Sequence, residues 1–249
     1  MTTVVIVPGS FSIPRAYDSF VQDLEKSGIR AVVVKLASVG RKETPGTLSD
    51  DVDAISEVVT PLLDAGQEVV LLTHSYGGVP GSQSLEKLSD KARRANGGHG
   101  VKKIIYMASV ILPVGTSNMD ATRASIPEWM TFEEHYMVLD TAEVAKITFS
   151  DMPAEEGLAL ATKNMDVHSI ASFEEKLRYP GYNDVDEIHY ILCEEDKVIP
   201  PQFQEAMLEL LKASTGKDSI VHRLKSGHAP STSQSGNVVD IVKKVIEGK

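Results

Sequence analysis

The chain has 249 residues, of which 42% are hydrophobic and 24% are charged. This composition is that of an ordinary globular protein, and the length suits one α/β domain with a sizeable buried core. The formal net charge of −10 argues against binding to nucleic acid, which needs a basic surface.

The N-terminal apolar run Val4–Val7 stops at Pro8 and Gly9, too early for a secretion signal, and no apolar stretch reaches the length of a membrane span. The single cysteine, Cys193, excludes an internal disulfide and fits a reducing compartment. We therefore expect a cytoplasmic protein with no membrane partner. We expect neither a cofactor nor a metal, and the sequence leaves open whether the chain forms a homodimer.

Short β-branched runs alternate with longer helical patterns, which is typical of an α/β fold with a mostly parallel sheet. The predicted strands are Thr3–Val7, Arg30–Leu36, Glu68–Thr73, Lys102–Ser109, Glu187–Cys193 and Ser219–Leu224. The predicted helices are Ala16–Ser27, Leu48–Asp64, Tyr76–Leu88, Pro201–Leu211 and Val238–Ile246. The pattern predicts about six strands flanked by helices.

Residues 116–184 break this alternation and hold the only tryptophan, Trp129. Helical patterns run through the segment at Phe132–Leu139, Thr141–Phe149 and Ala154–Lys163, without a convincing strand pair. We therefore expect a core of residues 1–115 and 185–249 and a small helical lid (cap) of residues 116–184. Its apolar side chains either form the lid's own core or face a substrate pocket, for which we select Phe11, Met119, Trp129 and Met130.

The segment Thr73-His74-Ser75-Tyr76-Gly77 lies between a predicted strand and a predicted helix. It matches the G-x-S-x-G nucleophile elbow, with Thr73 in place of the first glycine. A serine on such a turn has an exposed hydroxyl beside a helix N-terminus that favours negative charge. Ser75 is therefore the candidate nucleophile.

A serine nucleophile needs a base, and His228 lies on a loop just beyond the last predicted strand. Glycine before it and proline after it suit an irregular loop. His74 borders the nucleophile, but the elbow turn is expected to aim its side chain away from the hydroxyl. The remaining histidines lie in predicted strands, in the lid or in a glycine-rich loop: His189, His222, His135, His168 and His99.

The third member of a triad should follow another strand, because parallel sheets place their sites at the carboxyl ends of strands. Asp196 follows the predicted fifth strand, with Glu194 and Glu195 as competitors. The order Ser75, Asp196, His228 is the chain order of α/β-hydrolase triads. We expect the oxyanion to be bound by the backbone N–H groups of Tyr76 and Ser10, with Phe11 as the alternative to Ser10.

The chain as a whole resembles the α/β-hydrolase fold superfamily, and most of all its compact group of methylesterases, hydroxynitrile lyases and related esterases. The resemblance rests on motifs spread over nearly the full length: Val5-Ile6-Val7-Pro8-Gly9-Ser10, Thr73-His74-Ser75-Tyr76-Gly77-Gly78, Glu195-Asp196-Lys197-Val198-Ile199-Pro200 with Phe203-Gln204, and Gly227-His228-Ala229-Pro230. It implies the fold, the lid and the Ser-His-Asp triad, but not the substrate.

The chain departs from the family pattern at several positions. Pro8 replaces the histidine of the usual His-Gly pair, and Thr73 replaces a glycine. Ala229 stands where the cyanohydrin-cleaving relatives carry a lysine, which weakens a lyase interpretation.

The leading hypothesis is an esterase or lactonase that acts on a small to medium, largely apolar molecule through an acyl-enzyme. One alternative is a lyase, cyclase or decarboxylase that acts on a natural-product intermediate in the same pocket. A non-catalytic small-molecule receptor is the third, and least favoured.

Overall fold

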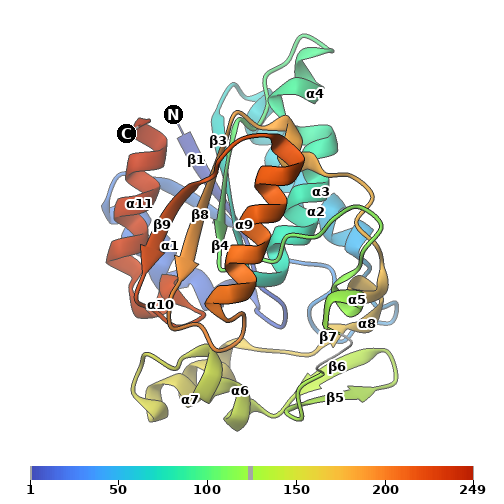
Figure 1. The fold of residues 1–249 in the computed structure, drawn as a ribbon, viewed down its shortest axis with the longest axis vertical. Helices are drawn as coiled ribbons and strands as arrows, with labels where there is room; N and C mark the ends of the chain where they lie inside the picture. The colour runs from blue at the N-terminus through green and yellow to red at the C-terminus, as the bar shows by residue number, and fades with distance from the viewer. Residues whose placement is uncertain (1, 123–125, 249) are drawn as a thin grey trace.

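The computed structural model of the protein describes residues 2–122 and 126–248. Its main sheet has six strands in the order β2-β1-β3-β4-β8-β9, and every neighbouring pair is parallel (Figure 1). The strands are β1 Thr2–Val7, β2 Arg30–Val33, β3 Glu68–His74, β4 Lys103–Met107, β8 Glu187–Cys193 and β9 Ile220–Leu224. The predicted parallel sheet of about six strands is confirmed.

Helices cover both faces of this sheet. Successive strand residues face opposite layers, so Val4 and Ile6 pack with α1 and α11, whereas Val5 and Val7 belong to the core shared with α2, α3 and α9. These helices are α1 Asp18–Lys26, α11 Ser235–Glu247, α2 Leu48–Asp64, α3 Gly78–Leu88 and α9 Pro201–Thr215. Shorter helices are α4 Asp90–Arg94 and α10 Pro230–Ser233, with 3-10 turns η1 Pro14–Tyr17, η2 Ser75–Gly77 and η4 Gly181–Asp184.

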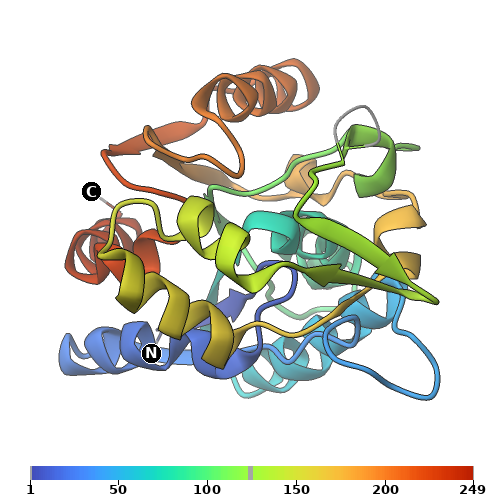
Figure 2. The ribbon, with the colours of Figure 1, turned by 90° about the horizontal axis from the view of Figure 1, so that it is seen from below.

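The segment between β4 and β8 lies across the carboxyl ends of the strands (Figures 1 and 2). It contains helices α5 Asn118–Thr122, α6 Thr141–Thr148, α7 Ala154–Asn164 and α8 Ile170–Glu174, and strands β5 Met130–Glu133, β6 Tyr136–Leu139 and β7 His168–Ser169. Helices α6 and α7 occupy the two later predicted helical patterns of this segment. The segment as a whole is mixed α and β rather than wholly helical.

The helix expected over Phe132–Leu139 is wrong, because this stretch forms most of an antiparallel hairpin. Glu134 makes the turn with φ 52°, and β6 then pairs with β7 through Tyr136–Ser169 and Met137–His168. Tyr136 and Met137 become buried in that small sheet. The pairing partner lies about thirty residues further along the chain, so a local pattern could not show it.

Candidate active site

The elbow begins where β3 ends, and Ser75 has a left-handed backbone conformation with φ 52°. Non-glycine residues rarely adopt this conformation, and it persists only where the surroundings hold it. Here the carbonyl of Ser75 accepts a hydrogen bond of 2.9 Å from the N–H of Val110, beyond the end of β4. The turn therefore presents the Ser75 hydroxyl at the carboxyl edge of the sheet, where α3 begins.

Thr73, the residue that departs from the elbow pattern, fits because α3 carries a glycine opposite it. A Cβ placed on Gly81 would lie 2.5 Å from the Cγ2 methyl of Thr73. The Thr73 hydroxyl is 3.0 Å from the Oγ of Ser109, which donates to the Thr73 carbonyl at 2.8 Å. The β-branched side chain of Thr73 is therefore accommodated at Gly81, and the Thr73 hydroxyl is hydrogen-bonded in the core.

The three residues predicted as a triad lie within hydrogen-bonding distance of one another. The Oγ of Ser75 is 2.9 Å from Nε2 of His228, and Nδ1 of His228 is 2.8 Å from Oδ2 of Asp196. All three residues are buried. Because the Asp196 carboxylate accepts the proton on Nδ1, Nε2 carries a lone pair toward the serine, as a general base requires.

Asp196 is held by its own loop and by α9. Its Oδ1 accepts the backbone N–H groups of Val198 and Ile199, each at 2.8 Å, while Oδ2 accepts Nε2 of Gln204 at 3.3 Å. Gln204 is fully buried and also bonds the backbone of Cys193 and Ile199. The two competing acids, Glu194 and Glu195, make no such contact to His228.

The loop after β1 lies directly against the nucleophile. A Cβ on Gly9 would lie 3.1 Å from the Cβ of Ser75, so a larger residue could make this approach only if its neighbours moved by a few tenths of an ångström. Phe11 has φ 64°, and its N–H donates to Nδ1 of His168 at 3.2 Å. The Phe11 N–H is thus already engaged, which leaves Ser10 as the better oxyanion donor of the two predicted.

His74 links this loop to His228, the candidate base, through a chain of hydrogen bonds. The N–H of Gly9 donates to Oη of Tyr17 at 3.0 Å, and Tyr17 in turn donates to Nδ1 of His74 at 2.7 Å. Nε2 of His74 then donates to the carbonyl of His228 at 2.8 Å. Burial, reinforced by the neighbouring His228, lowers the pKa of His74 to about 3. His74 therefore stays neutral and, as predicted, does not bond the Ser75 hydroxyl.

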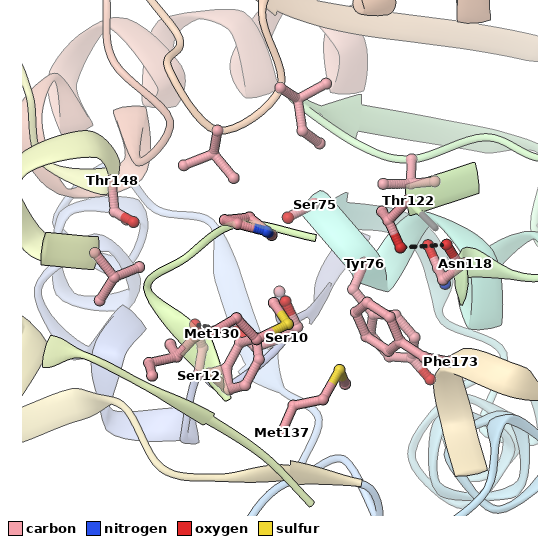
Figure 3. Close-up of a pocket in the computed structure, with 18 of the residues that line it drawn as sticks. Ser10, Ser12, Ser75, Tyr76, Asn118, Thr122, Met130, Met137, Thr148 and Phe173 are labelled. Carbon is pink, nitrogen blue, oxygen red and sulfur yellow. Dashed lines mark hydrogen bonds between the residues drawn. The ribbon is translucent and has the colours of Figure 1, made fainter. Parts of the chain in front are cut away.

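A cavity of about 220 Å³ opens over Ser75 and is roofed by the segment between β4 and β8. Thr148 lies on one side of Ser75, and Asn118 and Thr122 lie on the other (Figure 3). The described residues that line the cavity include no Asp, Glu, Lys or Arg. All four residues selected for the pocket are among them: Phe11, Met119, Trp129 and Met130.

Three buried residues named in the sequence analysis, His74, His168 and Gln204, were given no role there but make hydrogen bonds around the candidate triad. Their contacts join segments far apart in the chain. The only local signal for these three residues was a polar residue inside a segment expected to be buried.

Among the described residues, no cluster of three His, Cys, Asp or Glu side chains could hold a metal ion. In the same part of the chain, no helix has the length and apolar character needed to cross a bilayer.

Comparison with known proteins gives concordant matches. The model of a family described as the alpha/beta hydrolase family matches residues 4–241. A probable hydrolase from a Phoma species is 34% identical and covers 97% of this chain and 97% of its own length. A methyl jasmonate esterase from Vitis vinifera is 23% identical over 90% of this chain and 88% of its own. Among solved structures, polyneuridine aldehyde esterase has a TM-score of 0.77 at 21% identity, over 98% of this chain and 99% of that one.

Proposed function

The chain belongs to the alpha/beta hydrolase family, and on this premise we propose that it hydrolyses a carboxylic ester or lactone through an acyl-enzyme on Ser75. Membership confirms the family, the fold and the esterase class of enzyme predicted from the sequence. The observation that carries the finer proposal is the continuous hydrogen-bonded line from Ser75 through His228 to Asp196.

The reaction follows from this geometry. The Ser75 Oγ attacks the ester carbonyl carbon while its proton passes to Nε2 of His228. The carbonyl oxygen becomes an oxyanion that accepts the N–H groups of Tyr76 and Ser10. Collapse breaks the bond to the leaving oxygen, which takes the proton from Nε2. Water then repeats the sequence on the acyl-enzyme and releases the acid.

The cavity favours an uncharged substrate that is largely apolar. None of the described residues that line the cavity is charged, and an unpaired carboxylate or ammonium group is costly to bury among them. Methionine and aromatic side chains around Ser75 can fit irregular apolar groups on either side of the ester. We propose that residues 116–184 serve as the lid that closes this cavity over a small to medium molecule.

The test combines a variant with a chemical probe. Ser75→Ala should abolish turnover of uncharged p-nitrophenyl esters. A serine-directed phosphonate should add its mass to the wild-type chain at Ser75 and leave Ser75→Ala unmodified. Thermal unfolding of both proteins checks that the variant is folded.

Two results would overturn the proposal. Turnover that survives in Ser75→Ala would show that the serine is not the nucleophile. Efficient conversion of a substrate without any phosphonate labelling of Ser75 would instead favour a lyase, cyclase or decarboxylase with His228 as the base.

A further inference from the structure

The oxyanion loop, residues 9–11, is held from two directions. On the core side, Gly9 bonds Tyr17 and through it His74. On the other side, Phe11 bonds His168, which lies on β7 in the segment that roofs the cavity. Ser10 lies between these two anchored residues, and its N–H is the proposed oxyanion donor.

Nδ1 of His168 accepts one hydrogen bond, which comes from the Phe11 N–H of the oxyanion loop. The ring is fully buried, and burial lowers its pKa to about 3. Nε2 lies 2.9 Å from the Oγ of Ser172, which donates its own proton to the carbonyl of Ser169 at 2.9 Å. Nε2 must therefore carry the imidazole proton, which leaves Nδ1 as a lone pair facing the Phe11 N–H.

The same ring also contacts the other oxyanion residue. His168 packs edge-on against the ring of Tyr76, with centroids 4.8 Å apart and planes at 75°. It lies 5.3 Å from the ring of Phe11. The His168 ring therefore contacts Tyr76, one proposed oxyanion donor, and Phe11, the neighbour of the other proposed donor, Ser10.

Phe11 needs such a partner because its φ of 64° is unfavourable for a non-glycine residue. Without an acceptor for the Phe11 N–H, the peptide between Ser10 and Phe11 would keep only the 3.4 Å hydrogen bond from the Ser12 Oγ to the Ser10 carbonyl. A shift of that peptide would displace the Cα of Ser10 and with it the adjoining peptide, which carries the Ser10 N–H. Oxyanion donors contribute to catalysis only when they are aimed in advance at the developing charge.

We propose that His168 is a positioning residue, which fixes the oxyanion loop through Phe11 and couples the roof of the cavity to the catalytic centre. This inference rests on the proposed function, since it assumes an acyl-transfer reaction at Ser75. His168 itself does not touch the reacting atoms.

The experiment compares His168→Leu with His168→Asn. Leucine removes the acceptor, whereas the Asn amide oxygen stands close to the place of Nδ1. We expect kcat of His168→Leu to fall ~100-fold with KM nearly unchanged, the loss typical of one oxyanion donor, and His168→Asn to recover much of it. Binding of a trifluoromethyl ketone, whose adduct carries an oxyanion, should weaken in parallel with kcat.

His189→Leu is the matched control, because His189 is also buried but lies on β8 and bonds His222, away from the oxyanion loop. It should leave kcat and ketone binding unchanged. If His168→Leu does not fold, Ser172→Ala tests the same proposal. This variant removes the hydrogen-bond acceptor of the Nε2 proton of His168, so the ring is held less firmly against Phe11 and kcat should also fall.

Equal losses in His168→Leu and His168→Asn, or a loss confined to KM, would overturn the inference. So would an unchanged kcat in His168→Leu or in Ser172→Ala. Phosphonate labelling of wild-type Ser75 is run alongside. If labelling succeeds while the His168 variants behave as wild type, only this inference fails, whereas absent labelling refutes the proposed function.

Discussion

At the scale of single residues, His228, the proposed general base, is constrained at three points. Asp196 accepts at Nδ1, Ser75 lies at Nε2, and the backbone carbonyl accepts from His74. Each partner is itself bonded to a different segment, so the imidazole has one orientation and one tautomer. This explains why a carboxylate on one loop can control a proton transfer on another.

Asp196→Asn tests this control of the tautomer. Oδ1 receives two backbone N–H groups, so the amide oxygen must occupy that position and the NH2 must face His228. An N–H directed at Nδ1 favours the tautomer that protonates Nε2, which then cannot accept the serine proton. We expect kcat to fall about 10⁴-fold, as for the same exchange in serine-protease triads.

The measurement is steady-state hydrolysis of an uncharged ester, with circular dichroism as the check of folding. Gln204 donates to Oδ2 and would oppose the new NH2, so a modest loss of stability should accompany the variant. A loss of kcat below tenfold would contradict the assigned role of Asp196.

At the scale of elements, the elbow depends on close packing between β3 and α3. Thr73 and Gly81 form a matched pair, because the methyl of one occupies the space where the other lacks a side chain. The hydrogen bond from Thr73 to Ser109 joins the same strand to the end of β4. The elbow can therefore carry a β-branched residue where the G-x-S-x-G pattern has glycine.

Gly81→Ala should destabilise the protein by about 1–3 kcal/mol, the usual cost of inserting a methyl into a filled core. In the Thr73→Ser background the same change should cost clearly less, because serine keeps the hydroxyl and removes the methyl. Urea unfolding of the four proteins gives this double-mutant cycle. Equal costs of Gly81→Ala in both backgrounds would show that the two residues do not compete for space.

The elements that the sequence predicted are those with local signals. Strands end in turns at one edge of a parallel sheet, so Ser75, Asp196 and His228 could be brought together from pattern alone. The β5–β6 hairpin could not, because its burial depends on pairing with β7. The same pairing places His168 beside Phe11. Contacts that require two distant segments leave no periodicity for a single sequence to show.

At the scale of the whole molecule, the main sheet positions the proposed triad and the segment between β4 and β8 encloses it. Residues from both parts line the cavity, Val198 and Ile199 from the core and Val144 and Thr148 from the segment between β4 and β8. Beside this enclosed region, the imidazoles of His74 and His168 are both buried and hydrogen-bonded at each ring nitrogen. Because burial lowers the pKa of both His74 and His168, their protonation on unfolding makes the free energy of unfolding depend on pH.

His74 and His168 should make the protein sensitive to acid. Their pKa values fall from 6.5 to about 3 on folding, so between these limits the unfolded chain binds more protons than the native state. The free energy of unfolding must therefore decrease as pH falls from about 6.5 toward 3, by up to ~1.4 kcal/mol per pH unit for each histidine. The buried carboxyl of Asp51, whose pKa is raised by burial, acts in the opposite sense and is the same in a wild type and a histidine variant. Urea unfolding at several pH values between 7 and 5 should show a shallower dependence for His168→Asn than for wild type, by a difference that grows to close to one proton near pH 5. Identical slopes for the two proteins would mean that His168 is not held neutral in the folded state.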